Sequence, residues 1–173
     1  MGQANSQNFE KAVLAAGCFW GVEELIRAMP GVLNTEVGYC GGDEDEANYS
    51  TVKTGATEHA EAVLVEFDPQ KLSYRDLIRA FFRLHDPTTK NQQGNDIGRQ
   101  YRSAIFYMNE SQKIDALEVK NEVDRSGKWR RPIVTEVVPY GFEHGAEFYP
   151  AEEYHQDYLQ KNPDGYTCHY WRD

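Results

Sequence analysis

Cys18 stands between an apolar run and a segment whose apolar residues recur at helical spacing. The run, residues 12–16, predicts a buried strand, and Gly17 permits a sharp turn into the helix that follows. Unpaired backbone N–H groups at a helix N-terminus favour thiolate over thiol. Because Phe19 and Trp20 come next, we interpret Cys18 as a nucleophile beside a small apolar pocket. A buried cysteine followed by two core aromatic residues is the alternative, and both stay open on this stretch alone.

Glu61 lies in a stretch, residues 59–67, that predicts a central strand with apolar side chains on both faces. Because side chains two positions apart share a face of a strand, its carboxyl group lies beside Val63 and Val65. Apolar surroundings make ionisation costly, so we expect a raised pKa and a retained proton. That property suits a general acid. In the alternative interpretation, Glu61 sits at the strand end and reaches solvent.

A polar loop, residues 85–100, precedes the next predicted strand. Its glycines and dense polar residues could present Asp96 and Tyr101 toward a site, although most such loops are solvated turns. The loop alone therefore leaves a functional and a structural interpretation open.

The other two cysteines differ in their surroundings. Cys168 lies in the C-terminal stretch 165–169, and a cysteine on a segment that can move suits a resolving thiol, which displaces the oxygen of a sulfenic acid to form a disulfide. An exposed, unused thiol is the alternative. Cys40 precedes a Gly-Gly turn and is interpreted as structural, with an accessory thiol left open.

Composition limits the classes of function. The 173 residues carry a formal net charge of −10, which argues against nucleic acid or a membrane surface as partner, and 40% are hydrophobic, enough for a globular core. The chain lacks an apolar run of membrane-spanning length and a signal-peptide pattern, so we expect a cytoplasmic location. Three cysteines disfavour a secreted disulfide framework. Without a zinc spacing or a dinucleotide fingerprint, we expect no metal and no bound cofactor.

The elements that must position these residues follow one another as strand, helix, strand, strand, helix, strand. The strands are predicted at residues 11–16, 32–39, 59–67 and 101–108. The first helix is predicted at residues 18–28, and the second helix is capped by Ser73. This order predicts an α+β fold with a ferredoxin-like (βαββαβ) two-layer core, followed by C-terminal extensions (a helix at 110–125, a strand at 133–139 and a short helix at 151–160) and a coil tail. We expect residues 1–8 to form a flexible leader, and residues 9–173 a single catalytic domain.

Four motifs together resemble the peptide methionine sulfoxide reductase A family. Their order and separations fit the family from about residue 11 to the C-terminus. The motifs are Gly17-Cys18-Phe19-Trp20-Gly21-Val22-Glu23, Gly55-Ala56-Thr57-Glu58-His59-Ala60-Glu61-Ala62-Val63, His85-Asp86-Pro87-Thr88 and Gly94-Asn95-Asp96-Ile97-Gly98-Arg99-Gln100-Tyr101-Arg102-Ser103. The first and the last in combination are highly specific for this family.

The resemblance implies an antioxidant repair enzyme that reduces the S epimer of methionine sulfoxide, free or in proteins. Carried over by position, Cys18 is the nucleophile, and Phe19 and Trp20 hold the methyl group of the substrate. Glu61 hydrogen-bonds to the sulfoxide oxygen and protonates it.

The same resemblance assigns the remaining site residues. Tyr49 and Tyr101 donate hydrogen bonds to the sulfoxide oxygen, and Asp96 supports them through water. Cys168 matches the single resolving cysteine of members with a similar tail, which implies a Cys18–Cys168 disulfide. A dithiol protein such as thioredoxin, or dithiothreitol in vitro, then reduces that disulfide, and we expect a monomer.

Two positions depart from the family pattern. Cys40 stands where a small residue without a thiol is more usual, so an extra disulfide is open, and Glu58 replaces a frequent glycine. A thiol peroxidase and a redox-sensing binding module remain as alternative functions, because both also oxidise a cysteine to sulfenic acid.

Overall fold

The computed structural model describes residues 8–172, so residues 1–7 of the predicted leader lie outside the described residues. The strands are β1 (Glu10–Ala16), β2 (Val32–Cys40), β3 (Ala60–Phe67), β4 (Gln92–Gln93), β5 (Asp96–Ile97), β6 (Ser103–Tyr107), β7 (Glu136–Pro139) and β8 (Phe148–Pro150). The helices are α1 (Phe19–Arg27), α2 (Tyr49–Val52), α3 (Tyr74–Arg83), α4 (Glu110–Arg125) and α5 (Tyr158–Lys161). Two 3-10 turns also bear on the site: η2 (Arg99–Tyr101) and η4 (Glu153–His155).

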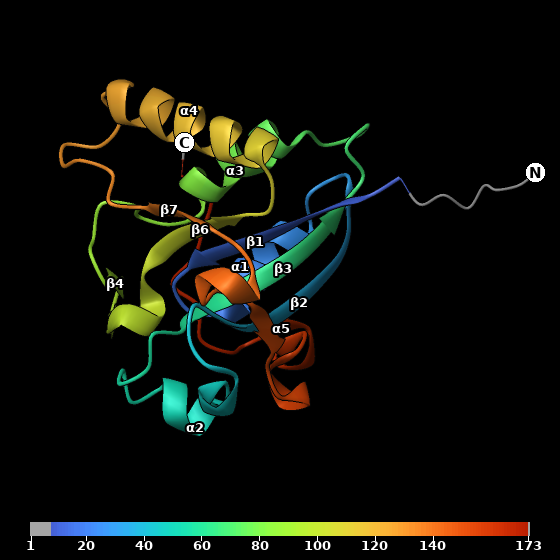
Figure 1. Ribbon diagram of the computed structural model, residues 1–173, viewed down its shortest axis with the longest axis vertical. Coiled ribbons are helices and arrows are strands. Elements are labelled where there is room, and N and C mark those ends of the chain that lie inside the picture. Colours follow the sequence, from blue (N-terminus) through green and yellow to red (C-terminus); the bar gives the residue numbers. More distant parts are fainter. Residues whose placement is uncertain (1–7, 173) are drawn as a thin grey trace, which may run out of the picture.

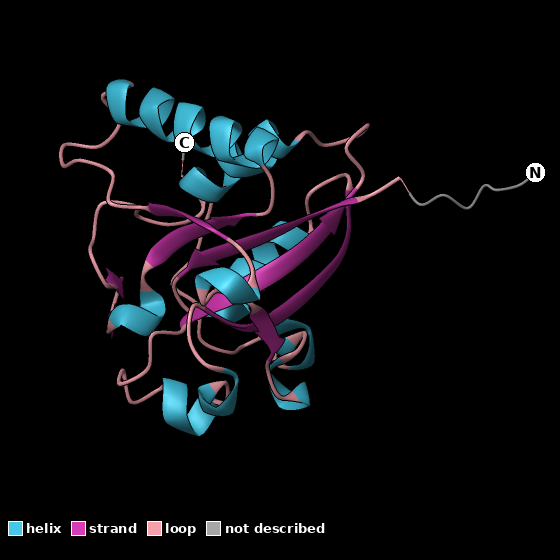
Figure 2. Cartoon of the chain, viewed as in Figure 1, coloured by secondary structure: helices cyan, strands magenta, loops and turns pink. Residues whose placement is uncertain are grey.

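A mixed sheet with strand order β7-β6-β1-β3-β2-β8 runs through the molecule (Figure 2). All its strand pairs are antiparallel except β6 with β7. Leu14 of β1 faces Val63 of β3 on one side and Ile105 of β6 on the other. The fold is therefore α+β, and the strand that leads into Cys18 lies inside the sheet beside the strand that carries Glu61.

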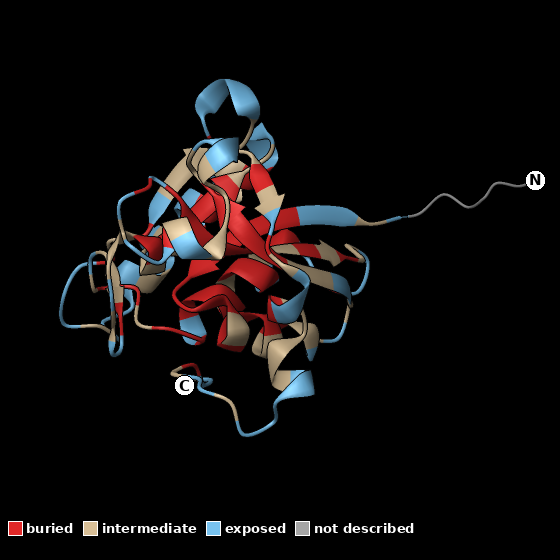
Figure 3. Ribbon diagram, turned by 90° about the horizontal axis from the view of Figure 1, so that it is seen from below, coloured by how far each residue is buried: buried red, intermediate tan, exposed pale blue. Residues whose placement is uncertain are grey.

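Side chains pack against both faces of the sheet, and the residues buried on one face are larger than those on the other. On one face Leu14 and Val63 pack with large residues of α1 and α3, such as Phe81. On the other face small residues such as Ala62 pack against the segment that contains Phe148. Figure 3 shows the buried residues concentrated in the strands and in helices against them. Each fully buried large apolar side chain contributes about 1.5–3 kcal/mol.

Polar residues cap the N-termini of α3 and α4, and the cap of α3, Ser73, is the one that the sequence predicts. Ser73 starts α3, because its Oγ accepts a hydrogen bond from the Asp76 N–H at 3.0 Å, and Asn109 starts α4 through Gln112 N–H at 2.9 Å. Caps of this kind contribute about 1 kcal/mol each. Helices α3 and α4 lie side by side in Figure 1.

The predicted helix at residues 151–160 is wrong. The chain instead forms η4 and α5, separated by residues 156 and 157, and the φ of Asp157, 54°, is left-handed. Two contacts hold that conformation: the Asp157 N–H donates to Glu23 Oε1 at 3.0 Å, and its carboxylate accepts from Arg27 at 2.8 Å. Both His155 and Tyr158 contact Trp20 of α1.

The coil tail ends beside α3. The N–H of Arg172 donates to the carbonyl of Arg83 at 2.8 Å, and the carbonyl of Arg172 accepts from Lys128 at 3.0 Å. Among residues 8–172, the helices are too short or too polar to cross a membrane.

Candidate active site

Cys18 occupies the corner between β1 and α1. Strand β1 ends at Ala16, Gly17 turns the chain with a φ of 97°, and Cys18 is the N-cap residue of α1. A Cβ at position 17 would lie 2.7 Å from Cβ of Gln93, so glycine is required there by space as well as by conformation. The thiol is buried, with 7% of the residue exposed.

Glu61 faces this corner from β3. Its Oε1 accepts a hydrogen bond from the Phe19 N–H at 3.1 Å, next to Cys18 in the chain. Burial, with a smaller effect of Asp96, raises the pKa of Glu61 to about 8 against the opposing effect of that N–H group. As the strand pattern predicts, the carboxyl group is buried and holds a proton at neutral pH.

A cavity of about 120 Å³ brings the sequence-predicted residues together. Its lining consists of Cys18, Phe19, Trp20, Tyr49, Glu61, Asp96, Tyr101 and Tyr166. The first seven are candidates from the sequence. Tyr166 was missed, because only the folded tail brings it to the cavity, where its hydroxyl donates to Asp96 Oδ2 at 3.1 Å.

The indole ring of Trp20 is held by two residues that the sequence did not single out as site residues. Its Nε1–H donates to Nδ1 of His155 at 3.0 Å, and its ring stacks on Tyr158 with 3.8 Å between centroids. His155 also lies 4.5 Å from the ring of Tyr49. These contacts fix the aromatic wall of the cavity before any ligand enters.

The thiol group of Cys18 is less acidic than its helix-terminal position suggests. Burial raises its pKa, and the charges of Glu61 and Asp96 add to that effect. A backbone N–H group of Trp20 lowers the pKa without reversing it. The helix terminus favours the thiolate, but desolvation outweighs that effect on the pKa.

The tail places Cys168 beside the same loop that supplies Asp96. Its Sγ lies 4.0 Å from Asp96 Oδ2 and 4.0 Å from the carbonyl of Gln93. The next residue, His169, is buried, and its Nε2 lies 2.7 Å from the carbonyl of Ala16 at the end of β1. Asp96 thus contacts Cys168 and also lines the Cys18 cavity.

Known proteins resemble this chain in sequence and in fold. The family model of peptide methionine sulfoxide reductase matches residues 10–173. The chain belongs to the peptide methionine sulfoxide reductase family. MsrA 1 of Mesorhizobium japonicum is 53% identical over 163 residues, which cover 94% of this chain and 90% of that protein.

Solved structures of a relative agree with this family membership. Reduced Mxr1 of Saccharomyces cerevisiae superimposes with a TM-score of 0.88 at 37% identity, covering 99% of this chain and 96% of that one. Mxr1 in complex with Trx2 gives a TM-score of 0.64 at 28% identity, covering 99% and 95%.

Cys40, the departure of this reductase from its family pattern, lies on the opposite face of the sheet from the Phe19 side chain. It is fully buried, and its thiol donates to the carbonyl of Ala146 at 3.5 Å. Burial raises its pKa to about 12. All three cysteines are free thiols in this structure. The other departure, Glu58, forms an ion pair with Arg99 at 3.2 Å.

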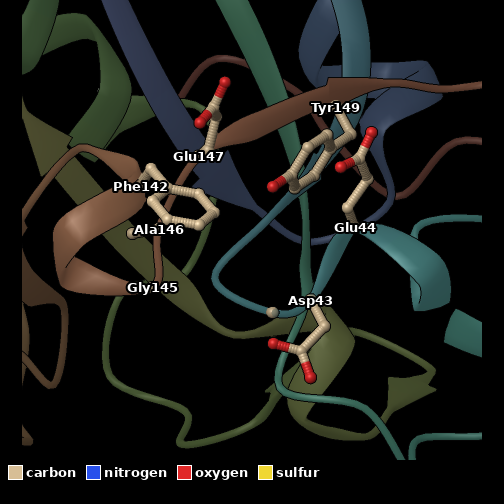
Figure 4. A pocket seen from close by; sticks show the side chains of 8 residues that line it. Asp43, Glu44, Phe142, Gly145, Ala146, Glu147 and Tyr149 are labelled. Carbon is tan, nitrogen blue, oxygen red and sulfur yellow. The ribbon is translucent and has the colours of Figure 1, made fainter.

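A second cavity of the reductase, of about 150 Å³, lies beyond the end of β2 (Figure 4). Asp43, Glu44 and Glu147 line it together with Phe142 and Tyr149. Within residues 8–172, no group of three His, Cys, Asp or Glu side chains is arranged to hold a metal ion.

Proposed function

We propose that this chain reduces the S epimer of methionine sulfoxide, free or in proteins, to methionine. The observation that carries the proposal is the shared cavity of Cys18 and Glu61, in which a buried thiol and a protonated carboxyl group line one small space. Membership of the peptide methionine sulfoxide reductase family supports the same activity.

In the first step, Cys18 attacks the sulfoxide sulfur while Glu61 gives its proton to the sulfoxide oxygen. A sulfoxide is a poor electrophile until its oxygen is protonated or strongly hydrogen-bonded. The thiol proton of Cys18 returns Glu61 to its acid form. The hydroxyl group then passes from the substrate sulfur to the Cys18 sulfur, so the substrate S–O bond and the new bond between the two sulfurs break. Methionine leaves, and Cys18 is left as a sulfenic acid. Because thiol and acid begin neutral, the buried site need not hold two negative charges at rest.

The remaining residues of the cavity bind and orient the substrate. Tyr49 and Tyr101 donate hydrogen bonds to the sulfoxide oxygen; burial raises the pKa of both phenols, which keeps them protonated donors. Asp96 supports them through water. Phe19 and Trp20 form the apolar wall for the methyl group, which selects a methyl sulfoxide by shape and excludes water.

The second step forms a disulfide between Cys18 and Cys168. Cys168 displaces the oxygen of the sulfenic acid as water, and thioredoxin, or dithiothreitol in vitro, reduces the disulfide. The contacts of Cys168 with Asp96 and Gln93 support its position near the cavity. The complex of Mxr1 with Trx2 supports a thioredoxin as the physiological reductant.

The proposal extends to the architecture. The strand order β6-β1-β3-β2 with α1 and α3 on one face supports a ferredoxin-like core, and residues 9–173 act as one catalytic domain. The enzyme works as a cytoplasmic monomer without a bound cofactor or metal, and its net charge of −10 disfavours nucleic acid and membrane partners.

Turnover of a methyl sulfoxide with dithiothreitol tests the proposal. We expect the S epimer to be reduced and the R epimer to be left unchanged, and an absence of Cys18-dependent turnover would refute the function. A Trp20→Ala variant separates this function from a thiol peroxidase, which needs no methyl pocket. We expect the variant to lose sulfoxide reduction and to retain oxidation of Cys18 by peroxide.

A further inference from the structure

The thiol of Cys168 has three acceptors around it. They are the carbonyl of Gln93 and Oδ2 of Asp96, both at 4.0 Å, and Nδ1 of His169 at 3.9 Å. A thiolate, not a thiol, attacks a sulfenic acid, and burial raises the pKa of Cys168 above its usual value. The second step therefore needs a group that removes this proton.

The buried ring of His169 is held with a lone pair toward Cys168. Nε2 lies 2.7 Å from the carbonyl of Ala16, and a carbonyl only accepts, so Nε2 carries the proton of the neutral ring. Nδ1 is then an acceptor, and it lies 3.9 Å from Sγ of Cys168. Burial lowers the pKa of His169 to about 4, which keeps this lone pair available at neutral pH.

Gly21 of α1 makes room for this ring. A Cβ at position 21 would lie 2.5 Å from Nδ1 of His169 and closer still to Oγ1 of Thr167. Oγ1 of Thr167 also accepts the His169 N–H at 3.1 Å. The site on α1 is therefore shaped to hold the tail with the imidazole in one orientation.

We propose that His169 is the general base of the disulfide-forming step. Its Nδ1 takes the proton of Cys168 as that sulfur bonds to the sulfur of Cys18, and the S–O bond of the sulfenic acid breaks. The hydroxide that leaves receives the proton from Nδ1 and becomes water, so Cys168 is oxidised, the sulfenic sulfur is reduced, and His169 returns to neutral. This inference rests on the proposed Cys18–Cys168 disulfide.

The charged and titratable groups around the pair favour histidine over Asp96 as the base. Asp96 already accepts from Tyr166, and its charge opposes a thiolate at Cys168. An imidazolium supplies the opposite charge and stabilises the thiolate directly. Tyr166 also acts on the pair, because a hydrogen bond between its side chain and Cys168 lowers the pKa of that thiol. The other groups that act on the pair are Arg172, which favours the thiolate, the buried His85, and the Cys18 thiol.

Two variants of His169 distinguish a general base from a residue that only holds the tail in place. In His169→Gln, the amide Nε2 can still donate to the carbonyl of Ala16, but the side chain has no basic nitrogen. His169→Ala loses the hydrogen bond as well as the basic nitrogen. Tyr170→Phe, one residue further along the exposed tail, is the matched control. Reduced protein is mixed with one equivalent of a peptide methionine S-sulfoxide, or with hydrogen peroxide, and quenched. Released methionine, sulfenic acid and free thiols are counted separately.

We expect His169→Gln to slow disulfide formation at least about tenfold near neutral pH and to accumulate sulfenic acid, with both oxidants. Its rate should rise about tenfold per pH unit between about pH 6 and about pH 8, because it follows the thiolate fraction, while the wild-type rate changes less than about twofold. A His169→Gln rate and pH profile equal to the wild type would overturn the proposal and leave His169 as an anchor.

Two further outcomes distinguish this proposal from catalysis by Asp96 and from a failure of the proposed function. If Asp96→Asn introduces the pH dependence and His169→Gln does not, then Asp96 is the base and the proposal is wrong. If wild-type protein releases no methionine from the sulfoxide but forms the disulfide with peroxide, the proposed function fails while the role of His169 is still measured.

Discussion

Cys18 lies at the end of a buried strand, whereas Cys168 lies on a coil that side chains hold in place. The first thiol is positioned by the β1–α1 corner, with Gln93 packed against Gly17. The second is held by its neighbour His169 on the carbonyl of Ala16. Both thiols have pKa values raised by burial, yet only Cys18 has a buried carboxylic acid beside it.

The difference fits two different tasks. A nucleophile that must meet one small substrate in one orientation benefits from a rigid corner, since misplacement of reacting atoms slows a reaction sharply. A thiol that must reach the first one, and then present a disulfide to another protein, benefits from a segment that opens at low cost. We therefore expect variants at the β1–α1 corner to slow the first step, and variants of the tail to slow disulfide formation.

The largest effect is expected at the β1–α1 corner that positions Cys18, called the rigid site below. Cys18→Ser should abolish reduction of the S-sulfoxide with either reductant, because a serine hydroxyl in this buried place is neither nucleophilic nor oxidisable. Methionine production measured by chromatography checks this. Cys40→Ser, on the other face of the sheet, is the control and should keep wild-type turnover. Turnover by Cys18→Ser would place the nucleophile elsewhere.

Glu61→Gln should lower the rate of the first step by about 10²–10⁴, the usual contribution of a general acid. The wild-type rate should fall as pH rises through about 8, where Glu61 loses its proton, and the variant should lack this fall. Single-turnover release of methionine across pH measures both. An unchanged fall in the variant would assign the titration to another group.

The same variant tests the effect of the buried acid on stability. The folded pKa of Glu61, about 8, exceeds the ordinary value of 4.5, so the folded state binds more protons between the two. The free energy of unfolding should therefore decline from about pH 4.5 to about pH 8, an effect that Glu61→Gln removes. Urea titrations across this range check the expectation, and parallel wild-type and variant curves would contradict it.

Cys168→Ser should have an intermediate effect that depends on the reductant. Dithiothreitol reduces the sulfenic acid of Cys18 directly, so part of that activity survives, whereas thioredoxin needs the disulfide and its cycling is mostly lost. Parallel assays with the two reductants measure the split. Full thioredoxin cycling in this variant would indicate that Cys40 is the resolving thiol.

The smallest effect is expected for Gly21→Ala. Alanine favours a helix by up to about 1 kcal/mol over glycine, yet its Cβ displaces Thr167 and His169 of the tail. We expect disulfide formation to slow about tenfold while the corner keeps the first step. Rapid-quench counting of methionine and thiols separates the steps. Equal slowing of both would show that the tail and the corner are not independent.

Much of the rigid site could be predicted from the sequence, because local patterns determine it. The apolar run before Gly17 indicates a strand, helical spacing after it indicates α1, and alternation around Glu61 gives the shared face. The raised pKa of Glu61 followed from the same pattern. The raised pKa of Cys18 did not, since the depth of its burial depends on segments remote in the chain.

The contacts of the C-terminal segment could not be predicted, because they join residues that are far apart in the sequence. Asp157 breaks the expected helix through Glu23 and Arg27, which a local pattern does not reveal. Tyr166 and His169 reach the site only through the path of the tail. The lack of a side chain at Gly21 was visible in the sequence, but its partner was not.

Peptide mapping after a single turnover tests the central claim most directly. Reduced protein receives one equivalent of the methionine S-sulfoxide without any reductant, is alkylated, and is digested for mass analysis. The account predicts one methionine per chain, a disulfide that joins Cys18 to Cys168, and a free thiol at Cys40. Release of methionine with a disulfide through Cys40, or no release at all, would contradict it.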